Sequence, residues 1–79
     1  MIVKFTFKNA TGHIVHLSQT IEKSTGAPTR EVATDLAGKE FAKARLNFHQ
    51  REAVNSVTVE GIGPKPFIIK RDDFTIAIL

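Results

Sequence analysis

The sequence predicts a small α+β domain in which one long helix packs on one face of an antiparallel sheet of four to five strands. Two observations predict this class. Apolar and polar residues alternate near both ends of the chain, which is typical of half-buried strands, whereas residues 29–52 repeat their apolar positions with the period of a helix. The expected order of elements is strand, strand, helix, strand, strand, strand. Together they form a single domain over residues 1–79.

Length and composition limit the classes of protein that this chain can belong to. A chain of 79 residues has room for one hydrophobic core, and 42% hydrophobic with 24% charged residues is typical of a globular domain. Cysteine is absent, which excludes disulfide bonds and thiolate metal sites. No stretch approaches the roughly 20 apolar residues that span a bilayer, so we expect a cytoplasmic protein without membrane contact.

A β-hairpin is expected at the start of the chain. Residues 2–8 and 13–21 form its strands, and residues 9–12, which include asparagine and glycine, form its turn. The expected inner face is apolar and consists of Val3, Phe5 and Phe7 in the first strand and Val15, Leu17 and Ile21 in the second. The expected outer face of the second strand is polar and consists of His16, Ser18 and Thr20.

Residues 29–52 form the predicted helix, with Thr29 as its N-cap. Gly38 lies near its middle, where glycine costs roughly 1 kcal/mol relative to alanine, so a bend or a division into two shorter helices would fall there. One side of this helix is apolar and should face the sheet. Its residues are Ala33, Ala37, Phe41, Ala44 and Phe48, with Leu36 on the flank.

The alternation returns after the helix and predicts three more strands, at about residues 56–60, 67–69 and 74–79. A rigid loop with two glycines and two prolines joins the first two, and a tight turn at residues 71–73 joins the last two. The last strand is apolar on both faces, which suits a central strand or one that pairs with another molecule. Because one helix covers one face of a sheet, the second face must be polar or be covered by a partner.

The chain lacks a complete catalytic or metal-binding motif, and we expect neither an enzyme nor a cofactor. His13 and His16 have an H-x-x-H spacing, but residues three apart on a strand point to opposite faces and cannot ligate one metal. Asp72 and Asp73 are adjacent acidic residues in an expected solvent-exposed turn. The loop at residues 61–66 contains glycines and a lysine, but its prolines remove amide donors that phosphate binding needs.

Protein binding is the first functional hypothesis, with the chain acting as a small regulator or inhibitor of another protein. The outer face of the second half of the helix carries a leucine among lysines and a glutamine, and Lys65 lies in the rigid loop. The expected partner-binding residues are Lys39, Lys43, Leu46, Gln50 and Lys65. The alternative for this helix face is simple solvation, since the helix dipole favours basic residues late in a helix.

Nucleic-acid binding is the alternative hypothesis, because the formal net charge is +3. The residues expected to carry it lie on the polar sheet face and on the helix, and they are Lys4, Lys8, His16 and Arg45. Two observations weigh against this hypothesis. The excess positive charge is spread along the chain and forms no patch. Phe5 and Phe7 share a face, as base-stacking residues do in RNA-binding sheets, but the hydrophobic core needs that face. A homodimer is compatible with both hypotheses, because the second sheet face or the last strand could pair across a two-fold axis.

In its size and its order of strands and helix, the chain is similar to several groups of small phage or prophage proteins, including some anti-CRISPR inhibitors. The resemblance is one of architecture without a shared motif, so it assigns no role to any residue. What it implies is a free-standing module of the regulator or inhibitor type.

Overall fold

The computed structural model describes residues 2–22 and 30–75 of the chain and confirms the predicted α+β class. Strands and helices follow one another over these residues as β1 (Ile2–Lys8), β2 (Ile14–Ile21), α1 (Arg30–Lys43), α2 (Phe48–Ala53), β3 (Ser56–Glu60), β4 (Phe67–Lys70) and α3 (Arg71–Thr75). The strands predicted on either side of the rigid loop are therefore confirmed as β3 and β4.

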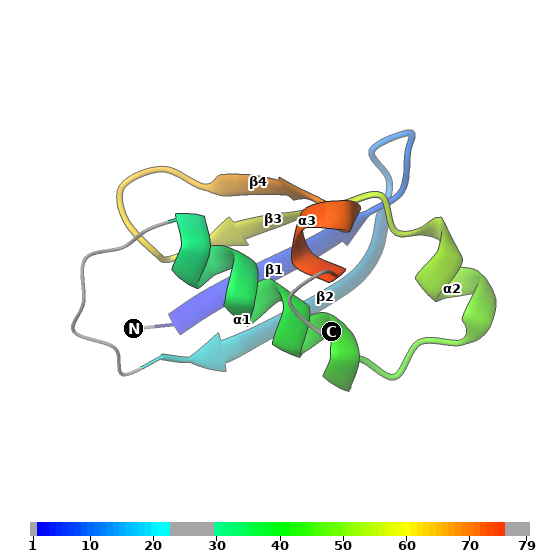
Figure 1. Cartoon of the computed structure of the whole chain (residues 1–79), viewed down its shortest axis with the longest axis horizontal. Helices are drawn as coiled ribbons and strands as arrows, with labels where there is room; N and C mark the ends of the chain where they lie inside the picture. Colours follow the sequence, from blue (N-terminus) through cyan, green and yellow to red (C-terminus); the bar gives the residue numbers. More distant parts are fainter. Residues whose placement is uncertain (1, 23–29, 76–79) are drawn as a thin grey trace.

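The strands form one four-stranded sheet in the order β2–β1–β3–β4, and every neighbouring pair is antiparallel. Figure 1 shows α1 lying diagonally across the sheet, with α3 on the same face and α2 beyond the end of the strands. Within residues 2–22 and 30–75, no helix covers the opposite face. None of the helices in these ranges is long and apolar enough to cross a membrane.

The hydrophobic core fills the space between the sheet and the two helices that cover it. Three phenylalanine rings form its centre: Phe41 lies 5.7 Å from Phe7 and 5.4 Å from Phe74, measured between ring centroids. The small side chains of α1 at Ala33 and Ala37 allow the helix to approach the strands closely. The other buried apolar residues of the core cluster are Val3, Phe5, Val54, Val57, Val59, Ile62 and Ile69.

The side chain of Asn9 holds the turn between β1 and β2. Its Oδ1 accepts hydrogen bonds from the backbone N–H of Thr11 at 3.0 Å, the hydroxyl of Thr11 at 2.8 Å and the backbone N–H of His13 at 2.9 Å. The backbone N–H of Asn9 donates in turn to the carbonyl of His13 at 2.9 Å. The geometry of this turn fixes the register between β1 and β2.

This register reverses the predicted faces of β2. Phe5 of the core lies directly opposite Ser18, and a β-bulge leaves Val15 without a direct partner in β1. Because directly paired residues share a face, His16, Ser18 and Thr20 face the helices, whereas most of the apolar residues of β2 face away together with Gln19. The prediction was therefore wrong for Leu17 and Ile21, which are exposed, and for the polar set His16, Ser18 and Thr20. Val15 packs against the core as expected.

Two helices replace the single helix predicted at residues 29–52. α1 ends at Lys43, and Gly38, where a division was expected, is buried inside it. The break falls instead just before Asn47, which starts α2 with a capping box. Its Oδ1 accepts from the N–H of Gln50 at 2.8 Å, and its own N–H donates to Oε1 of Gln50 at 2.9 Å. The expected N-cap, Thr29, lies outside the described residues.

The break changes the environment of Phe48, the last of the helix residues that were predicted to face the sheet. Its side chain is 72% exposed on α2. The prediction was wrong because a continuous helical wheel holds only while the helix continues, and the connection after Lys43 turns the following residues away from the sheet.

α3 replaces the predicted turn at residues 71–73 and the beginning of the predicted fifth strand. Asp72 and Asp73 lie in its first turn, where acidic side chains complement the helix dipole. Phe74 points into the core and is completely buried. Residues 76–79 of the predicted strand lie outside the described residues.

Candidate functional site

The register of the strands defines the residues on the face of the sheet that no described helix covers. Side chains alternate along a strand and directly paired residues share a face, so the neighbours of the buried residues Val3, Phe5 and Phe7 point away from the core. We call this surface the open face. Its residues are Ile2, Lys4, Thr6 and Lys8 of β1, Ile14, Leu17, Gln19 and Ile21 of β2, Ser56, Thr58 and Glu60 of β3, and Ile68 and Lys70 of β4.

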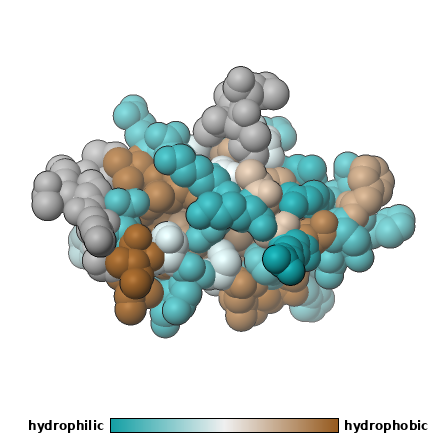
Figure 2. Space-filling model, turned by 90° about the horizontal axis from the view of Figure 1, so that it is seen from below, coloured by the Kyte–Doolittle hydropathy of each residue, from teal (hydrophilic) through white to brown (hydrophobic). Residues whose placement is uncertain are grey.

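Large apolar side chains gather on the open face. Six large apolar residues are exposed in the described ranges, and five of them lie here, each at least 57% exposed: Ile2, Ile14, Leu17, Ile21 and Ile68. Figure 2 views the molecule from the β2 side and shows hydrophobic side chains along the lower margin, separated by hydrophilic ones. Four of the five lie on β2 or beside it on β1, and we call Ile2, Ile14, Leu17 and Ile21 the apolar stripe. Apolar groups collected on one side in this way mark interaction surfaces more often than apolar groups scattered singly.

Lysines accompany the apolar residues on the open face. Lys4 and Lys8 lie on β1 and Lys70 on β4, and Glu60 of β3 lies directly opposite Lys4. A cross-strand pair of opposite charge contributes roughly 0.2–1 kcal/mol to the stability of a sheet. The open face is therefore mainly apolar along β2, and toward its middle and far side it carries three lysines among polar side chains, Glu60 and Ile68.

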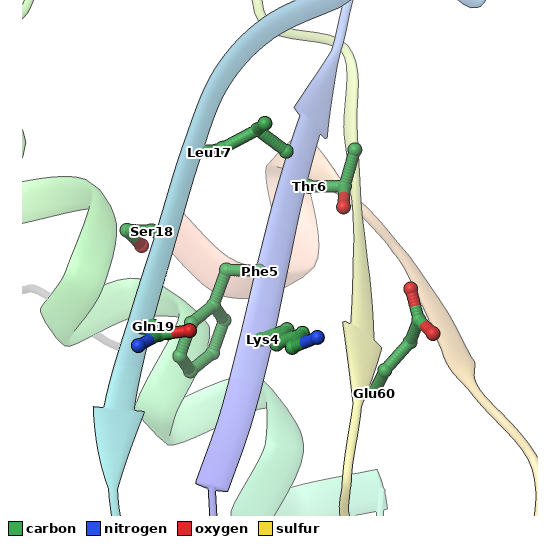
Figure 3. A pocket seen from close by; sticks show the side chains of 7 residues that line it. All are labelled: Lys4, Phe5, Thr6, Leu17, Ser18, Gln19 and Glu60. Carbon is green, nitrogen blue, oxygen red and sulfur yellow. The ribbon is translucent and has the colours of Figure 1, made fainter.

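A hollow of about 300 Å³ lies on the open face between the strands. Figure 3 shows Leu17 extending from β2 over β1, with Thr6 and Lys4 on β1 and Glu60 on β3. The residues that line it are Lys4, Phe5, Thr6, Leu17, Ser18, Gln19 and Glu60. Its size is at the lower limit of small-molecule sites, and its wall combines one exposed apolar side chain with polar groups on rigid strands.

Side chains capable of catalysis or metal binding are dispersed. Nδ1 of His13 lies 2.9 Å from the hydroxyl of Thr11 inside the first turn. His16 lies against Phe7 on the helix side of the sheet, with 6.0 Å between the ring centroids. Within residues 2–22 and 30–75, no three histidine, cysteine, aspartate or glutamate side chains come together in a group that could hold a metal ion.

The predicted partner-binding residues do not form one surface. Lys39 and Lys43 are exposed on α1, but Leu46 lies in the connection to α2 and packs, half-buried, against the core. The side chain of Gln50 is bonded within the capping box of α2, and Lys65 lies in the loop between β3 and β4. The prediction of a shared helix face was wrong because the helix on which it depended ends at Lys43.

The residues predicted for nucleic-acid binding are also divided. Lys4 and Lys8 share the open face, as expected. His16 lies on the opposite side of the sheet, because the hairpin register turns it toward Phe7. Arg45 lies in the connection between α1 and α2.

Sequence periodicity does not identify the apolar stripe, because β2 carries apolar residues at odd and at even positions. One usable signal is present in the sequence. Residues 14–21 contain no lysine, arginine, aspartate or glutamate, which is uncommon for a strand with one solvent-facing side.

The open face therefore combines apolar side chains that gain from leaving water with charged side chains that can orient a partner. These groups stand on strands whose positions the core fixes. No protein-family model, curated protein or solved structure matches this chain.

Proposed function

We propose that this chain is a non-catalytic protein-binding module that recognises its partner through the open face. The observation that carries the proposal is the placement of five of the six exposed large apolar residues of the described ranges on this one face. A domain of two layers has no internal use for apolar groups on its outer layer, so a partner surface accounts for them.

The energetics of burial support this proposal. Fully burying a leucine or isoleucine side chain contributes about 1.5–3 kcal/mol, so a few members of the apolar stripe can form the central anchor of an interface. The lysines and Glu60 stand beside the apolar residues, where charged groups favour encounter and orientation more than affinity. A partner with an apolar centre and an acidic margin fits this arrangement best.

The biological role that we propose is regulation or inhibition of another protein in the cytoplasm. Its support is the group of exposed apolar side chains on the open face, which offers a surface for a partner, together with a sequence that contains no cysteine, which suits a reducing compartment. A domain of this size presents one sheet face whose area is comparable to that of a small interface, which suits a protein that acts by covering part of its partner.

Affinity purification with matched variants tests the proposed face. The variant Ile2→Glu/Ile68→Glu changes two exposed residues of the open face, and Lys39→Glu/Lys43→Glu changes the exposed side of α1. A partner that is enriched by the original protein should be lost with the first variant and retained with the second. The captured protein is then purified, and calorimetry measures its affinity for all three forms.

The opposite result would contradict the proposed face. Loss of the partner with the α1 variant and its retention with the open-face variant would place the contact on α1. Circular dichroism of each variant shows that loss of binding does not result from loss of the fold.

Nucleic-acid binding is the second candidate, favoured by the three lysines of the open face, Lys4, Lys8 and Lys70. Phe5 and Phe7 are completely buried, so the aromatic residues of β1 give no stacking platform on this face. Fluorescence anisotropy with labelled single-stranded and double-stranded oligonucleotides tests it. Binding that weakens steeply with salt and is lost in Lys4→Glu/Lys8→Glu would support this function, whereas no binding at low salt would exclude it.

A further inference from the structure

The outer edge of β2 is an unusual feature of this sheet. β2 is the edge strand at one side, and its eight residues, Ile14–Ile21, contain no charged residue, proline or glycine. Such an edge presents unpaired backbone groups, and proteins commonly protect it with lysine, proline or shortening of the strand. The other edge is protected in this way: β4 has four residues, follows Pro66 and ends in Lys70.

We propose that two copies of the chain associate by antiparallel pairing of their β2 edges across a two-fold axis at Gln19. This interface goes beyond the proposed function, because it concerns the edge of the sheet and leaves the centre of the open face uncovered. It joins two four-stranded sheets into one continuous sheet.

The requirement that directly paired residues share a face is met by a two-fold axis at any residue of β2, and the pairs that form at Gln19 favour that position. An axis at Gln19 pairs Leu17 with Ile21 of the second copy on the open face, and Ser18 with Thr20 of the second copy on the helix side. Aliphatic pairs and serine–threonine pairs both stabilise neighbouring antiparallel strands. The same pairs occur twice, once on each side of the axis.

The distribution of charge favours edge pairing over stacking of two open faces. Stacking would bring Lys4, Lys8 and Lys70 of both copies together, with Glu60 as the acidic residue on each face. Edge pairing joins uncharged strands and keeps the lysines of the two copies apart. A second copy of the chain therefore fits the edge of β2 better than it fits the open face.

Disulfide trapping tests the axis directly, because the natural chain contains no cysteine. In the variant Gln19→Cys the two cysteines face each other across the axis, with Cα atoms about 4.5–5.5 Å apart, which is within the range of a disulfide. Mild oxidation should convert this variant rapidly to a covalent dimer. Ala42→Cys, at an exposed position of α1, is the matched control and should remain mainly monomeric.

The oligomeric state gives a second measurement. Sedimentation equilibrium of the natural chain should give twice the mass of one chain, and Leu17→Lys should shift it to the monomer, because the introduced lysine disfavours edge pairing. Ile68→Lys makes the same change on β4, away from the axis, and should leave the dimer intact. Circular dichroism shows whether each variant is folded.

Two results would overturn the proposed dimer. One is a monomeric natural chain together with equal oxidation rates for Gln19→Cys and Ala42→Cys. The other is cross-linking of Thr58→Cys, in the middle of the open face, while Gln19→Cys stays unlinked. Either result leaves the proposed function open, since the Ile2→Glu/Ile68→Glu comparison tests it separately.

Discussion

The guanidinium group of Arg51 lies over the ring of Phe41, 5.2 Å from its centroid, and donates hydrogen bonds to the backbone carbonyls of Phe41 and Ala44. These carbonyls belong to the C-terminal end of α1 and the residue after it, and each also accepts a backbone N–H, Phe41 from Ala44 at 3.3 Å and Ala44 from Leu46 at 3.0 Å. Arg71 acts in a similar way on the next helix, donating to the carbonyls of Glu52 and Val54. Two arginines thus connect the C-terminal ends of α1 and α2 to the next helix along the chain, Arg51 from α2 and Arg71 from α3.

Replacing Arg51 by alanine should lower the free energy of unfolding by about 2 kcal/mol, because two charge-assisted hydrogen bonds and a cation–π contact are lost. Urea denaturation followed by circular dichroism measures the change. Arg45→Ala is the control: Arg45 is exposed and should change stability by less than about 0.5 kcal/mol. Equal effects of the two substitutions would show that the contacts of Arg51 do not stabilise the fold.

Replacing Phe74 by alanine should lower the free energy of unfolding by about 3–5 kcal/mol, because its ring is completely buried against Phe41 and Phe7. This is a large share of the stability expected for a domain of this size. Phe48→Ala should have little effect, since Phe48 is 72% exposed. The urea midpoints of the two variants give the comparison, and a larger loss for Phe48 would contradict the placement of both rings.

Gly61 should tolerate alanine less well than Gly12. Both have positive φ values, 101° and 87°, which cost a non-glycine residue about 1–2 kcal/mol. A Cβ at residue 61 would also lie 2.1 Å from the carbonyl oxygen of Ile2, whereas nothing lies within 4 Å of a Cβ at residue 12. Thermal unfolding should therefore show a larger drop in Tm for Gly61→Ala, and the reverse order would contradict this close approach.

Replacing Asn47 by alanine should destabilise α2 by about 1 kcal/mol, because it removes the acceptor for the N–H of Gln50. Amide hydrogen exchange measures the loss locally, and exchange within α2 should become faster while β1 and β3 stay protected. Asn47→Asp keeps an acceptor at the same position and should preserve the protection. Equal exchange in both variants would show that the cap is not what holds α2.

The sequence predicts β1 and β3 well because each has an uninterrupted period of two and one completely buried face. In β1 the buried face can only be the one that carries Val3, Phe5 and Phe7, because all the residues between them are polar. The faces of β2 cannot be predicted in the same way. The bulge at Val15 shifts the phase of the strand, and the register depends on the turn rather than on the apolar pattern.

The division of the predicted helix shows two local patterns in conflict. Phe41, Ala44 and Phe48 continue the apolar period through the break, which favours one helix. Asn47 and Gln50 have the spacing of a capping box, which favours a new start, and the structure follows this second pattern. The contacts of Arg51 hold the second arrangement in place, and they join residues too far apart for sequence periodicity to show.

The candidate site could be predicted only in outline. A single layer of helix over a sheet implies a second face that is polar or covered, and the open face is that second face. Its residues depend on the β2 register, so an assignment from the alternation of apolar and polar residues places Leu17 and Ile21 in the core. Leu46 is assigned to a surface for a different reason: the predicted helix continues past Lys43, where α1 ends, and Leu46 packs against the core instead.

Oδ1 of Asn9 accepts three hydrogen bonds, so one oxygen atom holds the turn on which the outward-facing side chains of β2 depend. Adding or removing one residue in this turn would exchange every inward and outward side chain of the strand without changing its sequence. A change in the length of this turn during evolution would therefore bury or expose the apolar side chains of β2 without any substitution in the strand.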